Sequence, residues 1–347
     1  MKARLLIAVA LAPVLYAESK RVTVRETAGL ARAMEPVSVT VDGKERTLYV
    51  TIGARQTKTF RIEKLRAKEP LDLRPTDRVG FTVENGIFLA DLSKRIVNGQ
   101  EEDSGTLRAL TFKPLNVTLR RTQNRMHWAP SFQRIGARGY TSIAMWHPVQ
   151  QHARREVDGA IIATREGYHA LYPEIRLSAE YKFFPHVPYF LFQASMTVEK
   201  PIQMFWLRGQ EMTMDEFFTH VAWPGRDGKP RIATFDERKA ILEREPIPVD
   251  APWVAFLNEP MGYGFGAVSL AFRGSTLANA GVHINDGANN GKYWDRYLIG
   301  QKETALTPGD RYEEKTAYVL FRRLEEFLDQ EKKLRNPLEV KVEVKVQ

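Results

Sequence analysis

The sequence predicts an all-β protein, with a small N-terminal β-sandwich followed by a large antiparallel β-supersandwich and few helices. Residues 21–63 alternate apolar and polar side chains in four strand-length runs with turn residues between them, the pattern of half-buried antiparallel strands. Strand-length runs then continue from VGFTVEN (79–85) to TAYVLFRR (316–323). Helical periodicity is scarce, and the two candidate helices are 211–220 and 321–334.

The chain divides into four expected parts. Residues 1–17 have the form of a signal peptide, with Lys2 and Arg4 before an apolar run and the small Ala17 at a plausible cleavage site. Residues 18–64 form the small sandwich, 65–78 a charged linker that holds two prolines, and 79–347 the large glycan-binding or catalytic domain. The apolar run is too short to span a bilayer comfortably. We therefore expect a secreted or periplasmic protein without a transmembrane segment.

Composition narrows the chemistry. The chain has no cysteine, so thiol catalysis and cysteine-bound zinc are excluded and the core must supply the stability. The net charge is +9, which in an exported protein favours an acidic polysaccharide or oligosaccharide as partner over nucleic acid. Solubility alone accounts equally well for this charge. The oligomeric state is not predicted.

Five segments crowd histidine, tryptophan, tyrosine, arginine and amide side chains together: 121–130, 144–150, 165–176, 210–224 and 285–296. Flat aromatic faces beside hydrogen-bond donors suit a sugar ring. The predicted catalytic residues are His127, His147, His169 and Tyr172. The predicted substrate-binding residues are Arg121, Asn124, Arg125, Trp128, Trp146, Tyr293, Trp294 and Arg296.

Spacing explains these choices. On a strand, alternate residues from Arg121 to His127 share one face, which places charge neutralisers beside a possible base. The alternative is an exposed strand with scattered charges. Segment 210–224 favours a short docking helix, and 285–296 favours either a turn or a sugar platform with the Trp294 indole under the ring. An ordinary EF-hand is excluded because Ala288 and Tyr297 replace two of its oxygen ligands.

No HExxH, GxSxG or phosphate-loop motif is present. We therefore expect no cofactor and no metal ligands, and leave open only a divalent cation such as calcium in a structural or charge-neutralising role.

The succession of strands and the opening stretch RETAGLARAMEPVSVTV (25–41) resemble secreted bacterial β-supersandwich (galactose-mutarotase-like) carbohydrate-active proteins such as polysaccharide lyases. No signature motif accompanies the resemblance, so no catalytic residue is transferred. It implies a broad antiparallel sheet whose alternate side chains face a glycan.

The leading functional hypothesis is a polysaccharide lyase that cleaves a uronate-containing glycan by β-elimination, which needs charge neutralisers and a His or Tyr base. One alternative is a glycoside hydrolase on the same scaffold, which needs two nearby carboxylates. Another alternative is a non-catalytic glycan-binding or surface-assembly protein. The candidate carboxylates for hydrolysis are Glu174, Glu211, Asp215, Asp286 and Asp295.

Overall fold

The computed structural model describes residues 19–345 apart from 68, 98–99, 103–104, 123–124, 147–150, 276–280 and 287–290. The predicted signal peptide, 1–17, lies outside the described residues. Most of the described chain forms antiparallel strands, and its only α-helices are α1 (Arg238–Arg244) and α2 (Leu324–Arg335). The predicted all-β class is therefore confirmed. Neither helix has the length and apolar character needed to span a bilayer.

The small unit is a sandwich of two sheets. One sheet has the order β27-β1-β4, formed by β27 (Glu339–Lys345), β1 (Ser19–Arg25) and β4 (Thr57–Arg61), and the other pairs β2 (Arg32–Val41) with β3 (Lys44–Ile52). Alternate valines of β1, Val22 and Val24, are fully buried against Leu48 and Val50 of β3, as the alternating sequence requires.

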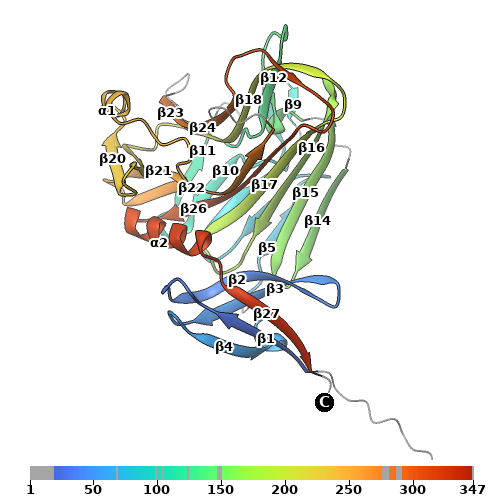
Figure 1. Ribbon diagram of the computed structural model, residues 1–347, viewed down its shortest axis with the longest axis vertical. Coiled ribbons are helices and arrows are strands. Elements are labelled where there is room, and N and C mark those ends of the chain that lie inside the picture. The colour runs from blue at the N-terminus through green and yellow to red at the C-terminus, as the bar shows by residue number, and fades with distance from the viewer. Residues whose placement is uncertain are drawn as a thin grey trace, which may run out of the picture.

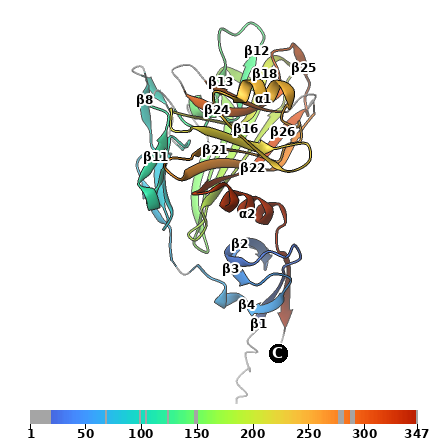
Figure 2. The same cartoon turned by 90° about the vertical axis from the view of Figure 1, so that its left-hand side faces the viewer.

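Strand β27 corrects the predicted domain boundary. All its residues pair with β1, so residues 339–345 belong to the small sandwich rather than to the unit predicted over 79–347. Figures 1 and 2 show this strand descending from α2 to the small sandwich. The linker in the structure is also shorter than the predicted 65–78, because residues 72–75 form a strand of the large unit.

Three sheets build the large unit. The five-stranded sheet has the order β11-β10-β7-β6-β5, and the six-stranded sheet has the order β13-β12-β18-β24-β23 with β25 paired to β18. The nine-stranded sheet has the order β14-β15-β16-β17-β26-β22-β21-β19-β20. The bounds are β5 (Asp72–Pro75), β6 (Phe81–Glu84), β7 (Phe88–Asp91), β10 (Ala109–Phe112), β11 (Val117–Arg120), β12 (Ser131–Arg134), β13 (Thr141–Ser142), β14 (Gln151–Val157), β15 (Ala160–His169), β16 (Tyr172–Phe183), β17 (Tyr189–Val198), β18 (Ile202–Met214), β19 (His220–Pro224), β20 (Pro230–Thr234), β21 (Trp253–Asn258), β22 (Tyr263–Gly274), β23 (Val282–Asp286), β24 (Lys292–Ile299), β25 (Thr304–Leu306) and β26 (Arg311–Phe321). A separate hairpin pairs β8 (Arg95–Val97) with β9 (Gln100–Glu102).

The main core lies where these sheets meet. Tyr181, Phe192 and Tyr318 of the nine-stranded sheet pack in one cluster with Met212 and Trp294 of the six-stranded sheet. The outer face of the nine-stranded sheet is polar along β14 to β17, while α2 packs against β22 and β26. The prediction of a helix over 321–334 is confirmed by α2. The helix predicted over 211–220 is wrong, because β18 runs to Met214 and β19 starts at His220.

Polar contacts join the two units. Asp158, in the turn between β14 and β15, accepts hydrogen bonds from the Arg46 Nε (2.7 Å) and the Thr47 amide (3.1 Å) of β3. Gly159 follows with a φ of 86°, and a Cβ there would lie 2.7 Å from that of Ala67. This turn therefore needs glycine both for its backbone conformation and for its close approach to the chain that links the units.

Candidate functional site

The predicted catalytic histidine His127 lies in the core. Its side chain is completely buried, its Nδ1 is 2.6 Å from the Tyr181 hydroxyl, and its ring centroid is 4.3 Å from that of Phe192. Burial lowers the pKa of His127 to about 3, so the ring is neutral at physiological pH. Enclosed by the rings of Tyr181, Phe192 and Tyr318, it has the environment of a core histidine.

Three more predicted residues are held by structural contacts. Arg121 pairs with Asp215 (3.3 Å), and the fully buried Arg125 donates to the carbonyl of Ser93 (2.7 Å). The indole of Trp146 is buried and donates to the Tyr168 carbonyl (3.2 Å). The predicted grouping of Arg121, Arg125 and His127 on one exposed strand face is wrong, because β11 ends at Arg120 and all three side chains are buried. His147 and Asn124 lie outside the described residues.

Segment 285–296 is divided between two environments by strand alternation. Trp294 packs in the core against Phe256 and Phe265, and Arg296 donates to Gln210 and to backbone carbonyls on the same side. Tyr293 points to the other face and remains partly exposed. The predicted sugar platform with the Trp294 indole under the ring is therefore wrong, because β24 turns Trp294 and Arg296 inward.

The same alternation builds a site that includes Tyr293. Tyr293, Asp295 and Tyr297 of β24 share the outer face of the six-stranded sheet with Trp206, Arg208 and Glu211 of β18. Trp128 and Tyr140 border this face from the chain around β12 and β13. We call Glu211 and Asp295 the carboxylate pair. The aromatic rim is Trp128, Tyr140, Trp206, Tyr293 and Tyr297.

A β-bulge places Arg208 and Glu211 on one face although they are three residues apart. The register of β18 with β24 shifts between Gly209 and Met212, and Gln210 has a left-handed φ of 54°. Regular alternation would turn one of the two side chains into the core, and the extra residue restores the direction. The Gln210 amide donates to the buried carboxyl group of Glu314 on β26, which holds the bulge from below.

One guanidinium contacts both members of the carboxylate pair. Nη1 of Arg208 lies 3.5 Å from Oε1 of Glu211 and 2.8 Å from Oδ2 of Asp295. These two oxygens are therefore no more than about 6.3 Å apart, which is closer than the roughly 6.5 to 9.5 Å of inverting glycosidases and compatible with the roughly 5 to 5.5 Å of retaining ones. The Arg208 guanidinium is fixed between the rings of Trp206 (3.6 Å) and Tyr297 (4.6 Å) and donates to the Tyr297 hydroxyl (2.9 Å).

The two carboxyl groups have different surroundings. Burial and the nearby Asp295 charge raise the pKa of Glu211 to about 7, although Arg208 and a 2.7 Å hydrogen bond from Ser131 oppose the shift. Asp295 is fully buried, and its Oδ1 lies 3.3 Å from Nδ1 of His283 on β23. Within the described residues neither oxygen of Asp295 accepts a well-directed hydrogen bond. A buried carboxylate with unused acceptors is typical of a site that awaits a ligand or water.

The aromatic rim gives this face its exposed surface. The Tyr140 ring is 41% exposed and lies 5.1 Å from that of Trp206 and 5.9 Å from that of Trp128. Burial raises the pKa of Tyr140, Tyr293 and Tyr297, and the carboxylate pair adds to the shift. The three hydroxyls therefore remain hydrogen-bond donors at neutral pH. Aromatic faces beside such donors suit a sugar ring.

The remaining predicted residues lie next to this face. His169 is 2.8 Å from the Thr141 hydroxyl through Nε2 and accepts the Leu171 amide at Nδ1, and Tyr172 accepts the Arg134 amide. Burial lowers the pKa of His169. Both residues line a cavity of about 730 Å³ that Tyr140 also borders. Of the twelve predicted site residues, the structure thus places Trp128 and Tyr293 on the rim and His169 and Tyr172 beside it.

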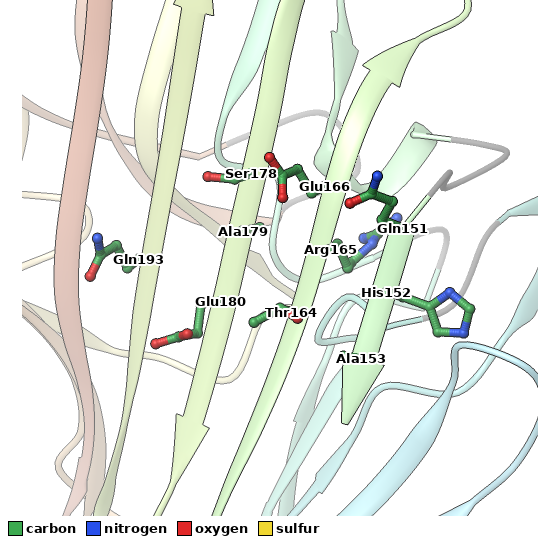
Figure 3. A pocket seen from close by; sticks show the side chains of 10 residues that line it. All are labelled: Gln151, His152, Ala153, Thr164, Arg165, Glu166, Ser178, Ala179, Glu180 and Gln193. Atoms are coloured by element: carbon green, nitrogen blue, oxygen red, sulfur yellow. The ribbon is translucent and has the colours of Figure 1, made fainter. Parts of the chain in front are cut away.

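A second hollow, of about 420 Å³, lies on the outer face of the nine-stranded sheet (Figure 3). Its lining includes Glu166, Ser178, Glu180 and Gln193, with no phenylalanine, tyrosine or tryptophan among its lining residues. Arg165 also borders it but is buried, donating to Thr106 and to the Ile143 and Trp146 carbonyls. In the described part of the chain no three histidine or acidic side chains are placed to hold a metal ion. The carboxylate pair, which lies beside an aromatic rim, is the better candidate for chemistry than this hollow.

Comparisons with known proteins identify the fold. No protein-family model and no curated protein matches this chain. Among solved structures, a glycosyl hydrolase family 38 protein from Enterococcus faecalis matches with a TM-score of 0.56 and 9% identity, over 94% of this chain and 47% of that chain. This chain therefore spans about half the length of that protein.

Two further solved structures match less closely. A galactose mutarotase-like protein from Lactobacillus casei has a TM-score of 0.43 and 11% identity, over 70% of this chain and 99% of that chain. A heparan sulfate lyase from Pedobacter heparinus has a TM-score of 0.42 and 10% identity, over 74% of this chain and 37% of that chain. At these identities the likeness concerns the fold alone. The structural neighbours thus include mutarotase-like, lyase and glycoside hydrolase domains, and the activity must be argued from the site.

Proposed function

We propose that this protein is a carbohydrate-active enzyme that hydrolyses a glycosidic bond at the carboxylate pair. The observation that carries the proposal is the pairing of Glu211, whose pKa is raised to about 7, with the ion-paired Asp295 beneath an aromatic rim. Two carboxyl groups in different surroundings can act as acid and nucleophile at one pH. Glycoside hydrolysis requires that combination.

The two carboxyl groups take complementary roles. Glu211 donates its proton to the glycosidic oxygen, which keeps the electron pair as its bond to the anomeric carbon breaks. The Asp295 carboxylate bonds to that carbon as the glycosidic bond breaks. Water then displaces Asp295 from the carbon and gives a proton to the Glu211 carboxylate, which restores both groups. Arg208 and Ser131 orient the pair through the contacts described above. The rim residues Trp206 and Tyr140 bind the sugar face.

Charge favours hydrolysis over β-elimination at this position. A lyase must neutralise a uronate carboxylate next to the carbon that loses a proton. Here one guanidinium, Arg208, already faces two carboxyl groups, so the pair offers no surplus positive charge to a uronate. The lyase hypothesis is therefore the second candidate, and the non-catalytic hypothesis the third.

The first test compares the full-length protein with its Glu211→Gln and Asp295→Asn variants on a panel of neutral and acidic oligosaccharides. We expect new reducing ends from the wild type and a loss of about 100-fold or more in kcat/KM for each variant. The matched control is Glu63→Gln, which changes an exposed carboxylate in the small sandwich and should leave the rate unchanged.

Each other outcome selects a different function. A product that absorbs in the ultraviolet band of an unsaturated uronate would favour the lyase. Glycan binding without turnover would favour the binding protein. Equal rates for Glu211→Gln and Glu63→Gln would contradict the proposed role of the carboxylate pair.

A further inference from the structure

The cavity beside His169 adjoins the aromatic rim at Tyr140. Tyr140 lines this cavity of about 730 Å³ and also packs against Trp206 and Trp128 of the rim. One side chain therefore forms the boundary between the carboxylate pair's face and the cavity. A chain of sugars bound over the rim would extend into this space.

The walls of the cavity have an apolar part. Met145 is 42% exposed and Leu171 is 70% exposed, beside the rings of Tyr140 and Tyr172. A single exposed apolar side chain is common on protein surfaces. Several of them that line a cavity next to a candidate site indicate a ligand-binding surface. Aliphatic and aromatic groups of this kind pack against the C–H face of a sugar ring.

Two arginines line the same cavity, and they differ in the contacts that their guanidinium groups make within the protein. Arg134 pairs with Glu174 (2.8 Å), donates to the Leu171 carbonyl (2.6 Å) and stacks on the Tyr172 ring (4.5 Å). Arg138 is exposed between Gly136 and Gly139, and within the described residues it contacts no carboxylate. Arg134 is thus committed to the protein, while the Arg138 guanidinium is available to an anion, which it binds well through two parallel hydrogen bonds.

We propose that this cavity is a subsite for the adjoining sugar residue of the glycan, and that Arg138 recognises a carboxylate or sulfate on that sugar. The inference rests on the proposed function, which places the scissile bond at the carboxylate pair. It also defines a substrate class. The sugar over the carboxylate pair is neutral, because that position offers no surplus positive charge, and its neighbour is anionic.

The test measures binding rather than turnover. In the full-length Glu211→Gln background, we would determine affinities for a uronate-containing oligosaccharide and its carboxyl-reduced form. A sulfated oligosaccharide and its desulfated form make a second pair, which separates the two sources of negative charge. We expect tighter binding of the anionic member of at least one pair, and an affinity that falls as salt is added.

The Arg138→Gln variant should lose about 10-fold in affinity for the anionic member and nothing for its neutral counterpart. Arg322→Gln, which removes an exposed arginine beside α2, is the matched control and should change neither. Leu171→Asp places a negative charge at the exposed edge of the cavity and should weaken anionic ligands alone, with Leu171→Asn as its uncharged control.

Two results would overturn the subsite while leaving the proposed function intact. One is equal affinity for the charged and the neutral oligosaccharide in both pairs of ligands. The other is an equal loss of affinity for the charged and the neutral oligosaccharide in the Arg138→Gln variant. Failure of every oligosaccharide to bind would overturn both the subsite and the proposed function.

Discussion

Glu211 and His127 show how burial shifts the pKa of an acid and of a base in opposite directions. Both are buried, and in both cases burial favours the neutral form. For Glu211 the neutral form carries a proton that can be donated, and its surroundings include a second carboxyl group and an exposed rim. For His127 the neutral ring is enclosed by Tyr181, Phe192 and Tyr318 and has no exposed surface. The type of residue therefore indicates possible chemistry, and its neighbours decide its use.

The pH dependence of the rate should follow the protonation of a single residue, Glu211. Glu211 must be protonated to act as an acid, so kcat/KM should fall by up to about tenfold per pH unit as the pH rises above about 7. Ser131 donates to the carboxyl group and thereby stabilises its ionised form. The Ser131→Ala variant should move this fall to higher pH. A pH profile that is identical in the wild type and in Ser131→Ala would contradict the assignment of Glu211 as the acid.

At the scale of the element, the bulge in β18 orients the site. It turns Arg208 and Glu211 to the same face, and the Glu314 carboxyl group accepts the Gln210 amide beneath it. A Cβ at Gly209 would lie 2.8 Å from Oε2 of Glu314, so glycine provides the room for this contact. Gly209 is the one signal of a bulge in 208–211, because an isolated glycine in a strand often marks one, whereas Gln210 is an ordinary residue in an unusual conformation. The direction of Glu211 could therefore not be derived from alternation alone.

The stability of this element should depend on pH through Glu314. Burial raises the pKa of Glu314 from 4.5 to about 8 in the folded protein. The unfolded chain loses this proton at lower pH than the folded chain, so the wild-type free energy of unfolding should fall as the pH rises from 4.5 towards 8. The contribution of this group is at most about 1.4 kcal/mol per pH unit.

Glu314→Gln keeps an acceptor for the Gln210 amide without an ionisable group, so its unfolding curves should vary less over this range. Denaturant unfolding at several pH values, with Glu313→Gln at a half-buried neighbouring carboxylate as the control, measures the difference. Parallel pH dependences in the wild type and in Glu314→Gln would refute this role.

At the scale of the whole molecule, the last strand closes the first sheet. β27 pairs along its length with β1, and Val340 and Val342 pack on the core of the small sandwich. Arg32 of this sandwich donates to the carbonyls of Lys333 and Asn336, at the end of α2. The small unit is therefore complete only when the end of the chain has been added.

Truncation after Asn336 should destabilise the small sandwich by about 2 kcal/mol or more, because it removes the buried Leu338 and two partly buried valines and exposes the edge of β1. Thermal unfolding and limited proteolysis of residues 19–64 measure this effect. Lys341→Gln, which changes a 77% exposed side chain of β27, is the control and should be neutral. A small sandwich that resists proteolysis equally in both proteins would show that β27 is dispensable.

The sequence by itself determined the all-β class, the small N-terminal sandwich and α2, because alternation and helical spacing report which side chains must be buried within one element. It also identified Glu211 and Asp295 among five candidate carboxylates, without indicating which of them meet. Tertiary structure alone decided that β27 returns to β1, that His127 lies in the core, and that a bulge joins Glu211 to Asp295 through Arg208. The first two depend on contacts between residues far apart in the chain, and the third on a local departure from strand alternation. Periodicity within one element does not encode either of these.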